Sequence, residues 1–347
     1  MTLRREPTSM NAAEERVGLV FLGRPSLSEQ IELARYAERQ GFESVWVCET
    51  RLVRDAITLL AAFATATDRI KLATGVVNNW TRTSALMAVT LATLHEMSQG
   101  RTMLVIGAYW DPLARKQGIR RRKTLTAMRE YVSVVRGLLR LETVTLEGEV
   151  VRVDDLRLDL GYDQPQEPIL VPIYIGATGP RMMELTGEVG DGIFHNFFTS
   201  VDYLTRSLER AETGAQGAGR TLQQVDMPQM AAIAMSEDGE AARHTARHSV
   251  AMYIGQQPRI ARASEVDEET IQQIQDTMSG WPPRTGGIED AMALVGDQTI
   301  DQLCAAGTPD MCRQRVQEYL DAGASYPVLC PLTQNIAEII DAFAPGS

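Results

Sequence analysis

The hydrophobic residues of this chain fall into short clusters that alternate with longer amphipathic segments. Eight short apolar clusters predict buried strands, at residues 17–22, 44–48, 70–77, 103–106, 170–175, 193–195, 227–235 and 325–332. Between them, apolar residues recur every three or four positions, which predicts helices with one buried face. Eight alternations of strand and helix are typical of a closed parallel barrel, so we predict a (β/α)8 TIM barrel of the α/β class.

Two segments interrupt this alternation. Residues 144–160 alternate apolar and polar positions around Gly148, which predicts a β-hairpin insertion at about 142–165. Residues 237–297 are polar and helical and are punctuated by proline and glycine, so we interpret them as a helical insertion or lid. Residues 1–15 contain no apolar core and are expected to form a flexible arm, which leaves 16–347 as a single barrel domain.

Composition limits the classes of function. The chain has 347 residues, of which 44% are hydrophobic, enough for one large core. Its net charge of −11 argues against nucleic acid or an anionic membrane as the main partner, and no apolar run has the length of a membrane span. The four cysteines lack CxxC spacing, and His244 and His248 lack the carboxylate of a metal motif. We therefore expect no metal site and a reduced, cytoplasmic protein.

The segment from Leu170 to Asn196 contains the clearest candidate for a binding site. An apolar strand ends at Gly176, and a turn leads into a helix that begins near Pro180. Free N–H groups at such a helix start suit an anion, above all a phosphate. The alternative is an ordinary strand–turn–helix unit without a ligand, because glycine turns are common between these elements.

In a parallel barrel, catalytic residues lie at the carboxyl ends of the strands. The residues at those ends are Glu49, Asn78, Tyr109, Trp110, Thr178, His195 and Asn196. Imidazole titrates near neutrality, so His195 is a candidate proton donor; the alternative is a core histidine. Glu49 is a candidate acid–base carboxylate, and the alternative is a structural salt bridge to Arg51 or Arg54.

Three segments carry a resemblance to a known family. They are Gly75-Val76-Val77-Asn78 to Gly100-Arg101, Gly148 to Asp159 continuing into PIYIGATGPRMMELTGEVGDG, and Ala306-Gly307-Thr308-Pro309 to Gly323. The chain resembles the bacterial-luciferase-like flavin and deazaflavin oxidoreductases, and within them the coenzyme F420 branch that includes methylenetetrahydromethanopterin reductases. The resemblance implies an F420-dependent oxidoreductase, most simply a reductase that uses reduced F420. It would transfer hydride between deazaflavin C5 and a small organic substrate, such as a C=C or C=N bond of a natural product.

The resemblance also implies a set of site residues. The cofactor would contact Gly75, Val76, Asn78, Gly107, Ala108 and Tyr109, and its phosphate would bind at Gly176, Ala177, Thr178, Gly179, Pro180, Arg181 and Met182. The substrate pocket would include Thr50, Trp80, Trp110, Asn196 and Phe198. Family members carry a non-proline cis peptide where this chain has Gly75-Val76. Many deazaflavin members end the second strand with Asp-His, whereas this chain has Glu49-Thr50 and therefore lacks the imidazole.

Several alternatives stay open. One is an FMN-dependent monooxygenase of the same fold, and another is a non-catalytic protein that binds a flavin or deazaflavin. The basic run from Arg115 to Lys123 either meets the glutamate tail of the cofactor or an acidic substrate, or is an ordinary charged helix start. The family commonly pairs through barrel helices, which implies a homodimer.

Overall fold

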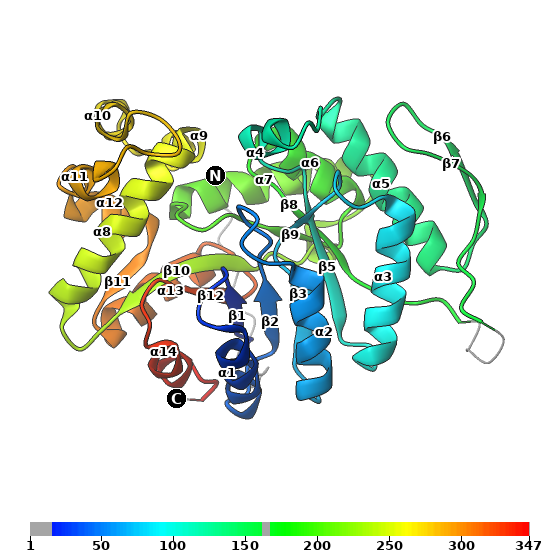
Figure 1. Cartoon of the computed structure of the whole chain (residues 1–347), viewed down its shortest axis with the longest axis horizontal. Helices are drawn as coiled ribbons and strands as arrows, with labels where there is room; N and C mark the ends of the chain where they lie inside the picture. Colours follow the sequence, from blue (N-terminus) through cyan, green and yellow to red (C-terminus); the bar gives the residue numbers. More distant parts are fainter. Residues whose placement is uncertain (1–15, 162–166, 347) are drawn as a thin grey trace.

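The computed structural model describes residues 16–161 and 167–346; the predicted arm at 1–15 lies outside the described residues. Eight parallel strands curl into a barrel with helices around it (Figure 1). In their order around the barrel, these strands are β12 (Pro327–Pro331), β1 (Gly18–Phe21), β2 (Ser44–Val47), β3 (Lys71–Thr74), β5 (Thr102–Gly107), β8 (Ile173–Gly176), β9 (Gly192–Phe194) and β10 (Gln229–Met235). The predicted (β/α)8 fold is confirmed.

Helices follow the strands and cover the outside of the barrel. They are α1 (Leu27–Arg39), α2 (Ala56–Ala66), α3 (Ser84–Met97), α5 (Thr124–Leu139), α6 (Pro180–Val189), α7 (Val201–Gly217), α13 (Pro309–Asp321) and α14 (Ile336–Ala342). The first three begin at a polar side chain that accepts a hydrogen bond from the N–H three residues later: Ser26, Asp55 and Thr83. Such N-caps satisfy N–H groups that have no partner within the helix, and so fix where each helix starts.

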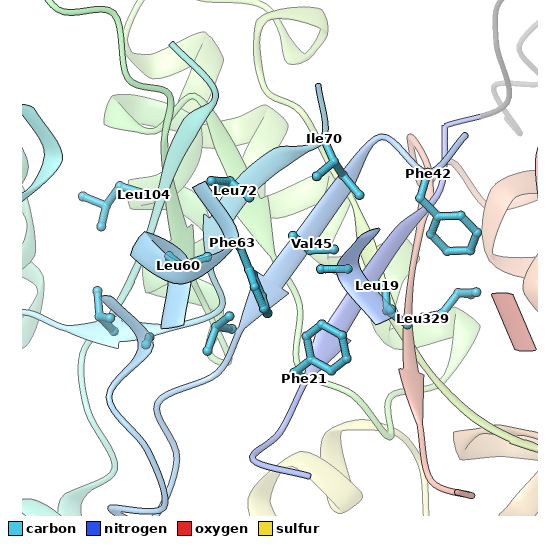
Figure 2. Packing of buried hydrophobic residues seen from close by; sticks show 14 of the residues in the cluster. Leu19, Phe21, Phe42, Val45, Leu60, Phe63, Ile70, Leu72, Leu104 and Leu329 are labelled. Atoms are coloured by element: carbon cyan, nitrogen blue, oxygen red, sulfur yellow. The ribbon is translucent and has the colours of Figure 1, made fainter. Parts of the chain in front are cut away.

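Two layers of apolar side chains hold the barrel together. Figure 2 shows part of the outer layer, in which strand residues such as Phe21 and Val45 lie beside Phe63 of α2. The rings of Phe21 and Phe63 are tilted, with centroids 5.7 Å apart. Inside the barrel, Trp46 and Phe194 stack at 4.5 Å with an interplanar angle of 11°. The barrel interior is therefore filled beneath its carboxyl end.

The barrel closes between β9 and β10 through the backbone of Asp226. The Ile193 N–H donates to the Asp226 carbonyl, and the Asp226 N–H donates to the Asp191 carbonyl, both at 2.9 Å. A single bridge between Gly192 and Asp226 thus replaces a longer ladder at this seam.

The side chain of Asp226 organises the amino-terminal end of the barrel. It accepts hydrogen bonds from Arg16 at 2.8 Å and from the Tyr174 hydroxyl at 2.6 Å. Arg16 also binds Glu43 at 2.6 Å, and its guanidinium lies 4.0 Å from the ring centroid of Tyr326. Side chains from five strands or strand starts therefore meet in one network.

The remaining elements are additions to the barrel. They are β4 (Val77–Asn78), α4 (Asp111–Lys116), the hairpin β6 (Val144–Glu147) and β7 (Arg152–Leu156), the 3-10 turn η1 (Leu222–Gln224), α8 (Gly239–Gln256), α9 (Pro258–Ala263), α10 (Glu268–Met278), α11 (Gly287–Met292), α12 (Asp297–Leu303) and β11 (Ala305–Gly307). The hairpin stands beside α5, whereas α8 to α11 gather at the opposite side of the molecule (Figure 1). Among the described residues, no helix is long and apolar enough to span a membrane.

The structure confirms the hairpin at the place predicted and corrects the sequence analysis in three respects. The predicted strand 70–77 is two strands, β3 and β4, because the Gly75–Val76 peptide is cis and interrupts it. The helical insertion continues to Leu303, beyond the predicted end at 297. The short elements α4 and β11 were not predicted, because segments of six and three residues are too short to show a helical or strand-like repeat of apolar positions. The predicted end of the hairpin insertion, at 165, falls among residues 162–166, outside the described part.

Candidate active site

A large cleft opens at the carboxyl ends of the barrel strands. Its volume is about 2260 Å³, and it is bounded by the strand ends on one side and by α4, α8 and α9 on the other. Pockets for one drug-sized ligand usually measure about 300–1,000 Å³, so this cleft has room for a cofactor and a second molecule together. The position agrees with the rule that barrel chemistry takes place at this end of the strands.

Most of the residues predicted from the sequence meet in this cleft. Its lining includes Glu49, Thr50, Gly75, Val76, Asn78, Gly107, Ala108, Tyr109, Trp110, Gly176, Ala177, Thr178, Gly179, Pro180, Met182, His195, Asn196 and Phe198. Two predicted residues, Trp80 and Arg181, do not line it. The Trp80 indole N–H donates to the Ala108 carbonyl at 3.1 Å and thus supports the wall of the cleft from behind, whereas Arg181 is exposed to solvent.

The turn after β8 presents unpaired backbone donors. Among the described residues, the N–H groups of Thr178, Gly179 and Arg181 have no hydrogen-bond partner, whereas those of Met182 and Met183 donate to the Gly179 carbonyl at 3.0 Å. Gly179 is the N-cap of α6 and has no side chain to cap it. Three free donors at the positive end of a ten-residue helix fit a phosphate group.

A tyrosine holds this turn in place. The Tyr203 hydroxyl of α7 donates to the Thr178 carbonyl at 3.1 Å. This contact orients the peptide that carries the free Gly179 N–H. Sequence reasoning missed Tyr203, because nothing in the spacing of α7 distinguishes it from a packing residue.

A bulge of the chain projects into the cleft at Val76. The Gly75–Val76 peptide is cis, as the resemblance implied. The Val76 side chain lies over Gly107 and Gly176, which are paired in register on β5 and β8. A Cβ at Gly176 would lie only 2.8 Å from Val76 Cγ1, and one at Gly107 3.0 Å from Val76 Cγ2. The two glycines therefore make room for the bulge.

Glu49 lies next to this bulge and is held by an arginine. The Glu49 N–H donates to the Val76 carbonyl at 3.2 Å. Both carboxylate oxygens accept hydrogen bonds from Arg82, at 2.8 and 2.9 Å, and Arg82 also binds Asp55. The hydrogen bonds that Arg82 donates to Glu49 and the attraction of both carboxylates raise the pKa of Arg82, against the effect of burial. The alternative partners named from the sequence, Arg51 and Arg54, were wrong.

Two polar side chains shape the loops that border the cleft. The Asn78 Oδ1 accepts hydrogen bonds from the Trp80 and Thr81 N–H groups, both at 2.9 Å, and so closes a tight turn. Arg121 donates to the Ala108 carbonyl at 3.0 Å and binds Asp111. Within the basic run, Arg121 therefore supports the loop after β5, and it also lines the cleft.

His195 lines the cleft by position, but its ring points away from it. The side chain is fully buried, and Nε2 lies 2.6 Å from the Ser207 hydroxyl of α7. Burial lowers the pKa of His195 to about 4, and the Pro228 backbone offsets this only in part. The ring is thus a neutral packing group between the barrel and α7, and this placement does not suit the predicted role of proton donor.

This placement predicts an acid-sensitive contribution to stability. The His195 pKa is about 4 in the folded chain and 6.5 in its ordinary state. As pH falls from 6.5 to 4, the unfolded chain binds a proton that the folded chain does not, so up to about 3 kcal/mol of unfolding free energy is lost. Urea unfolding across this range should show a shallower pH slope for His195→Gln. His248→Gln, at an exposed position, is the control; identical slopes for all three proteins would contradict the prediction.

Comparison with known proteins agrees with this geometry. Residues 2–326 match the model of the luciferase-like monooxygenase family. This chain belongs to that family. It is 30% identical over 309 residues to the 5,10-methylenetetrahydromethanopterin reductase of Methanolobus tindarius, which covers 89% of this chain and 91% of the relative. It is 25% identical to the F420-dependent glucose-6-phosphate dehydrogenase of Amycolatopsis mediterranei, with 86% of each chain covered.

Solved structures share this fold. The F420-dependent tetrahydromethanopterin reductase of Methanopyrus kandleri superposes with a TM-score of 0.84 at 24% identity, covering 96% of this chain and 99% of that one. An F420-dependent secondary alcohol dehydrogenase gives a TM-score of 0.76 at 20% identity, covering 95% and 97%. These values show that the shared fold extends over almost the whole chain.

Proposed function

We propose that this protein is a coenzyme F420-dependent oxidoreductase, acting as a reductase on an unsaturated organic substrate. The observation that carries the proposal is the placement of the free N–H donors of Thr178 and Gly179 and the Val76 bulge in one cleft. Relatives of 25–30% identity over most of the chain are named for F420 or for methylenetetrahydromethanopterin reduction, which supports the deazaflavin over FMN.

The residues present fit this cofactor. The N–H groups of Thr178, Gly179 and Arg181 would hold its phosphate, and Val76 with Gly107 would support the ring. When bound, F420 supplies hydride chemistry at C5 of the deazaflavin. The protein binds both partners in one orientation, and α8 and α9 limit the access of water to the cleft.

Glu49 is our proposed acid–base residue. Hydride transfer to a C=C or C=N bond requires a proton on the neighbouring atom. Glu49 lies beside the Val76 bulge, and Arg82 retains Asp55 as a partner when Glu49 takes up a proton. The contact with Asp55 thus keeps the Arg82 guanidinium paired with a carboxylate, whether Glu49 is protonated or ionised.

Replacing Glu49 with glutamine should lower turnover by about a hundredfold, because a positioned acid–base group contributes roughly that much. Glutamine keeps a hydrogen bond to Arg82, so the affinity for oxidised F420 should change by less than about threefold. Glu96→Gln, at an exposed glutamate of α3 outside the cleft, is the matched control. A loss of F420 affinity equal to the loss of turnover would show instead that Glu49 positions the cofactor.

A substrate screen tests the activity itself. Reduced F420 is mixed with the protein and with enones, unsaturated acids and cyclic imines, and the return of oxidised deazaflavin absorbance is followed. Turnover with at least one class supports a reductase. Tight F420 binding without turnover of any compound, in either direction, would favour the non-catalytic alternative.

The assembly and location of the protein complete the proposal. Leu86, Val89 and Met97 are 53%, 49% and 42% exposed on one face of α3, which supports a homodimer that pairs through barrel helices. Sedimentation equilibrium decides between monomer and dimer. Cys48, Cys304, Cys312 and Cys330 are all free thiols, which supports a place in the reducing cytoplasm.

A further inference from the structure

Four arginines line one side of the cleft without an ion-pair partner among the described residues. They are Arg24 after β1, Arg51 and Arg54 after β2, and Arg259 of α9. Arg51 makes one contact, from Nη1 to the Met252 sulfur at 3.6 Å. Many other arginines of the chain bind carboxylates, such as Arg129 to Glu188.

Arg54 shows most clearly that an acceptor is missing. Its Nη1 is shielded from solvent and has no hydrogen-bond partner. A shielded guanidinium N–H without an acceptor is unfavourable, so such groups are normally paired. Guanidinium groups bind carboxylate and phosphate through paired hydrogen bonds. The geometry therefore suits an anionic group of a ligand beside Arg54.

The segments that carry these arginines lie against one another. The loops after β1 and β2 touch, since a Cβ at Gly23 would lie 2.5 Å from Val53 Cγ1. The contact of Arg51 with Met252 joins the second loop to α8, and α8 leads directly into α9 and Arg259. The four side chains thus come from adjacent segments, namely the loops after β1 and β2 and helix α9, which form one corner of the cleft.

Few negative charges oppose them. The lining contributes three carboxylates among the described residues, and two of these are already bound: Glu49 by Arg82, and Asp111 by Arg121 and Arg115. Glu29, in the first turn of α1, is the remaining one and is exposed. The corner therefore has a net positive charge and attracts anions.

This corner lies across the cleft from the turn that would bind the cofactor phosphate. Around the eight-stranded barrel, β1 and β8 are four strands apart in either direction. Arg24 follows β1, and Gly179 follows β8. An anion bound by the arginines is therefore separate from one bound at Gly179.

We propose that the substrate carries a carboxylate or phosphate group and that Arg24, Arg51, Arg54 and Arg259 bind it. This proposal rests on the proposed function, since it names the class of substrate that shares the cleft with F420. The glutamate tail of F420 offers the same carboxylate chemistry, so the test must separate the two sources.

Calorimetric titration with pyrophosphate, on protein saturated with oxidised F420, tests the assignment. We expect saturable binding that Arg54→Gln weakens by about tenfold or more, because one charge-assisted pair of hydrogen bonds is lost. Arg24→Gln should weaken it in the same direction. Arg157→Gln, at an exposed arginine outside the cleft, should leave it unchanged. Arg54 has no partner to lose, so its replacement leaves the fold intact, and the affinity for F420 should stay the same.

Three results would overturn the assignment. The first is no saturable binding, and the second is equal binding by Arg54→Gln and the unchanged protein. The third is competition between pyrophosphate and F420 together with weaker F420 binding by Arg54→Gln, which would assign the corner to the cofactor tail. If F420 fails to bind while pyrophosphate binding still depends on Arg54, the proposed function fails and the anion site stands.

Discussion

Replacing Gly179 with aspartate is expected to weaken the binding of oxidised coenzyme F420 by about a hundredfold. A carboxylate roughly 5 Å from a phosphate costs about 3 kcal/mol at an effective dielectric constant of about 20. The new carboxylate would also accept hydrogen bonds from the N–H groups that the phosphate needs. Fluorescence titration of the variant with F420 measures the change directly.

Gly179 suits this test because the fold tolerates a side chain there. No heavy atom lies within 4 Å of a Cβ built at Gly179, and its backbone is extended, with φ −128° and ψ 153°. Gly179→Asn is the matched control, with the same shape and no charge, and should lose less than about tenfold in affinity. Equal losses of F420 affinity in both variants would indicate that the shape of the new side chain, and not its charge, weakens binding. No loss of affinity in either variant would show that the phosphate does not bind at the start of α6.

Replacing Asp226 with alanine should destabilise the protein more than any other single change considered above. Asp226 is the acceptor for Arg16 and for the Tyr174 hydroxyl where the barrel closes. Removing one partner of a buried ion pair typically costs about 3–5 kcal/mol, and we expect at most about 3 kcal/mol here because this pair is only partly buried and Arg16 keeps Glu43. Urea unfolding near neutral pH measures the loss, and Asp310→Ala, at an exposed ion pair, should leave the midpoint unchanged.

Acid should reduce the difference between Asp226→Ala and the unchanged protein. Burial alone would raise the pKa of Asp226, but hydrogen bonds from Arg16, Ser325 and Tyr174 bring it below the ordinary value. A lowered folded pKa gives stability that is present above the unfolded pKa, about 3.9, and lost as pH falls through the folded pKa. A difference in stability that is constant down to strongly acidic pH would show that Asp226 acts through packing alone.

Local patterns were sufficient to predict the barrel but not the contacts across it. The helix starts at Ser26 and Asp55 follow from capping chemistry within four residues of sequence. The partner of Glu49 is 33 residues away, in a loop without a motif, so sequence offered two nearer arginines and no reason to choose Arg82. Such long-range pairs depend on how neighbouring strand ends come together in space.

The orientation of His195 could have been predicted from the sequence, through the alternation of side chains along its strand. Successive residues of a strand face opposite sides of the sheet. Phe194 faces the barrel interior, where it stacks on Trp46, so His195 must face α7. If Phe194 is assigned to the barrel interior, the alternation of side chains along the strand places the His195 imidazole outside the barrel. The position at a strand end is therefore not sufficient to make a residue catalytic.

Local sequence patterns also could not predict that the arginines in the loops after β1 and β2 lack an ion-pair partner. From the sequence, Arg51 and Arg54 are candidates only as partners of Glu49. Arg82 takes that role, which leaves both arginines free to face the cleft. Whether an arginine is paired depends on the whole set of carboxylates around it, and spacing in the sequence does not give that set.

The most direct test of the central claim is to titrate the purified protein with oxidised coenzyme F420 and, separately, with FMN, following fluorescence quenching. The free N–H groups at Thr178 and Gly179 and the Val76 bulge predict tight, saturable binding of F420, and the named relatives predict weak or no binding of FMN. Preference for FMN would contradict the F420 assignment and direct the search to oxygen-consuming reactions. Binding of neither would show that the turn at Gly176 to Pro180 is structural in this protein.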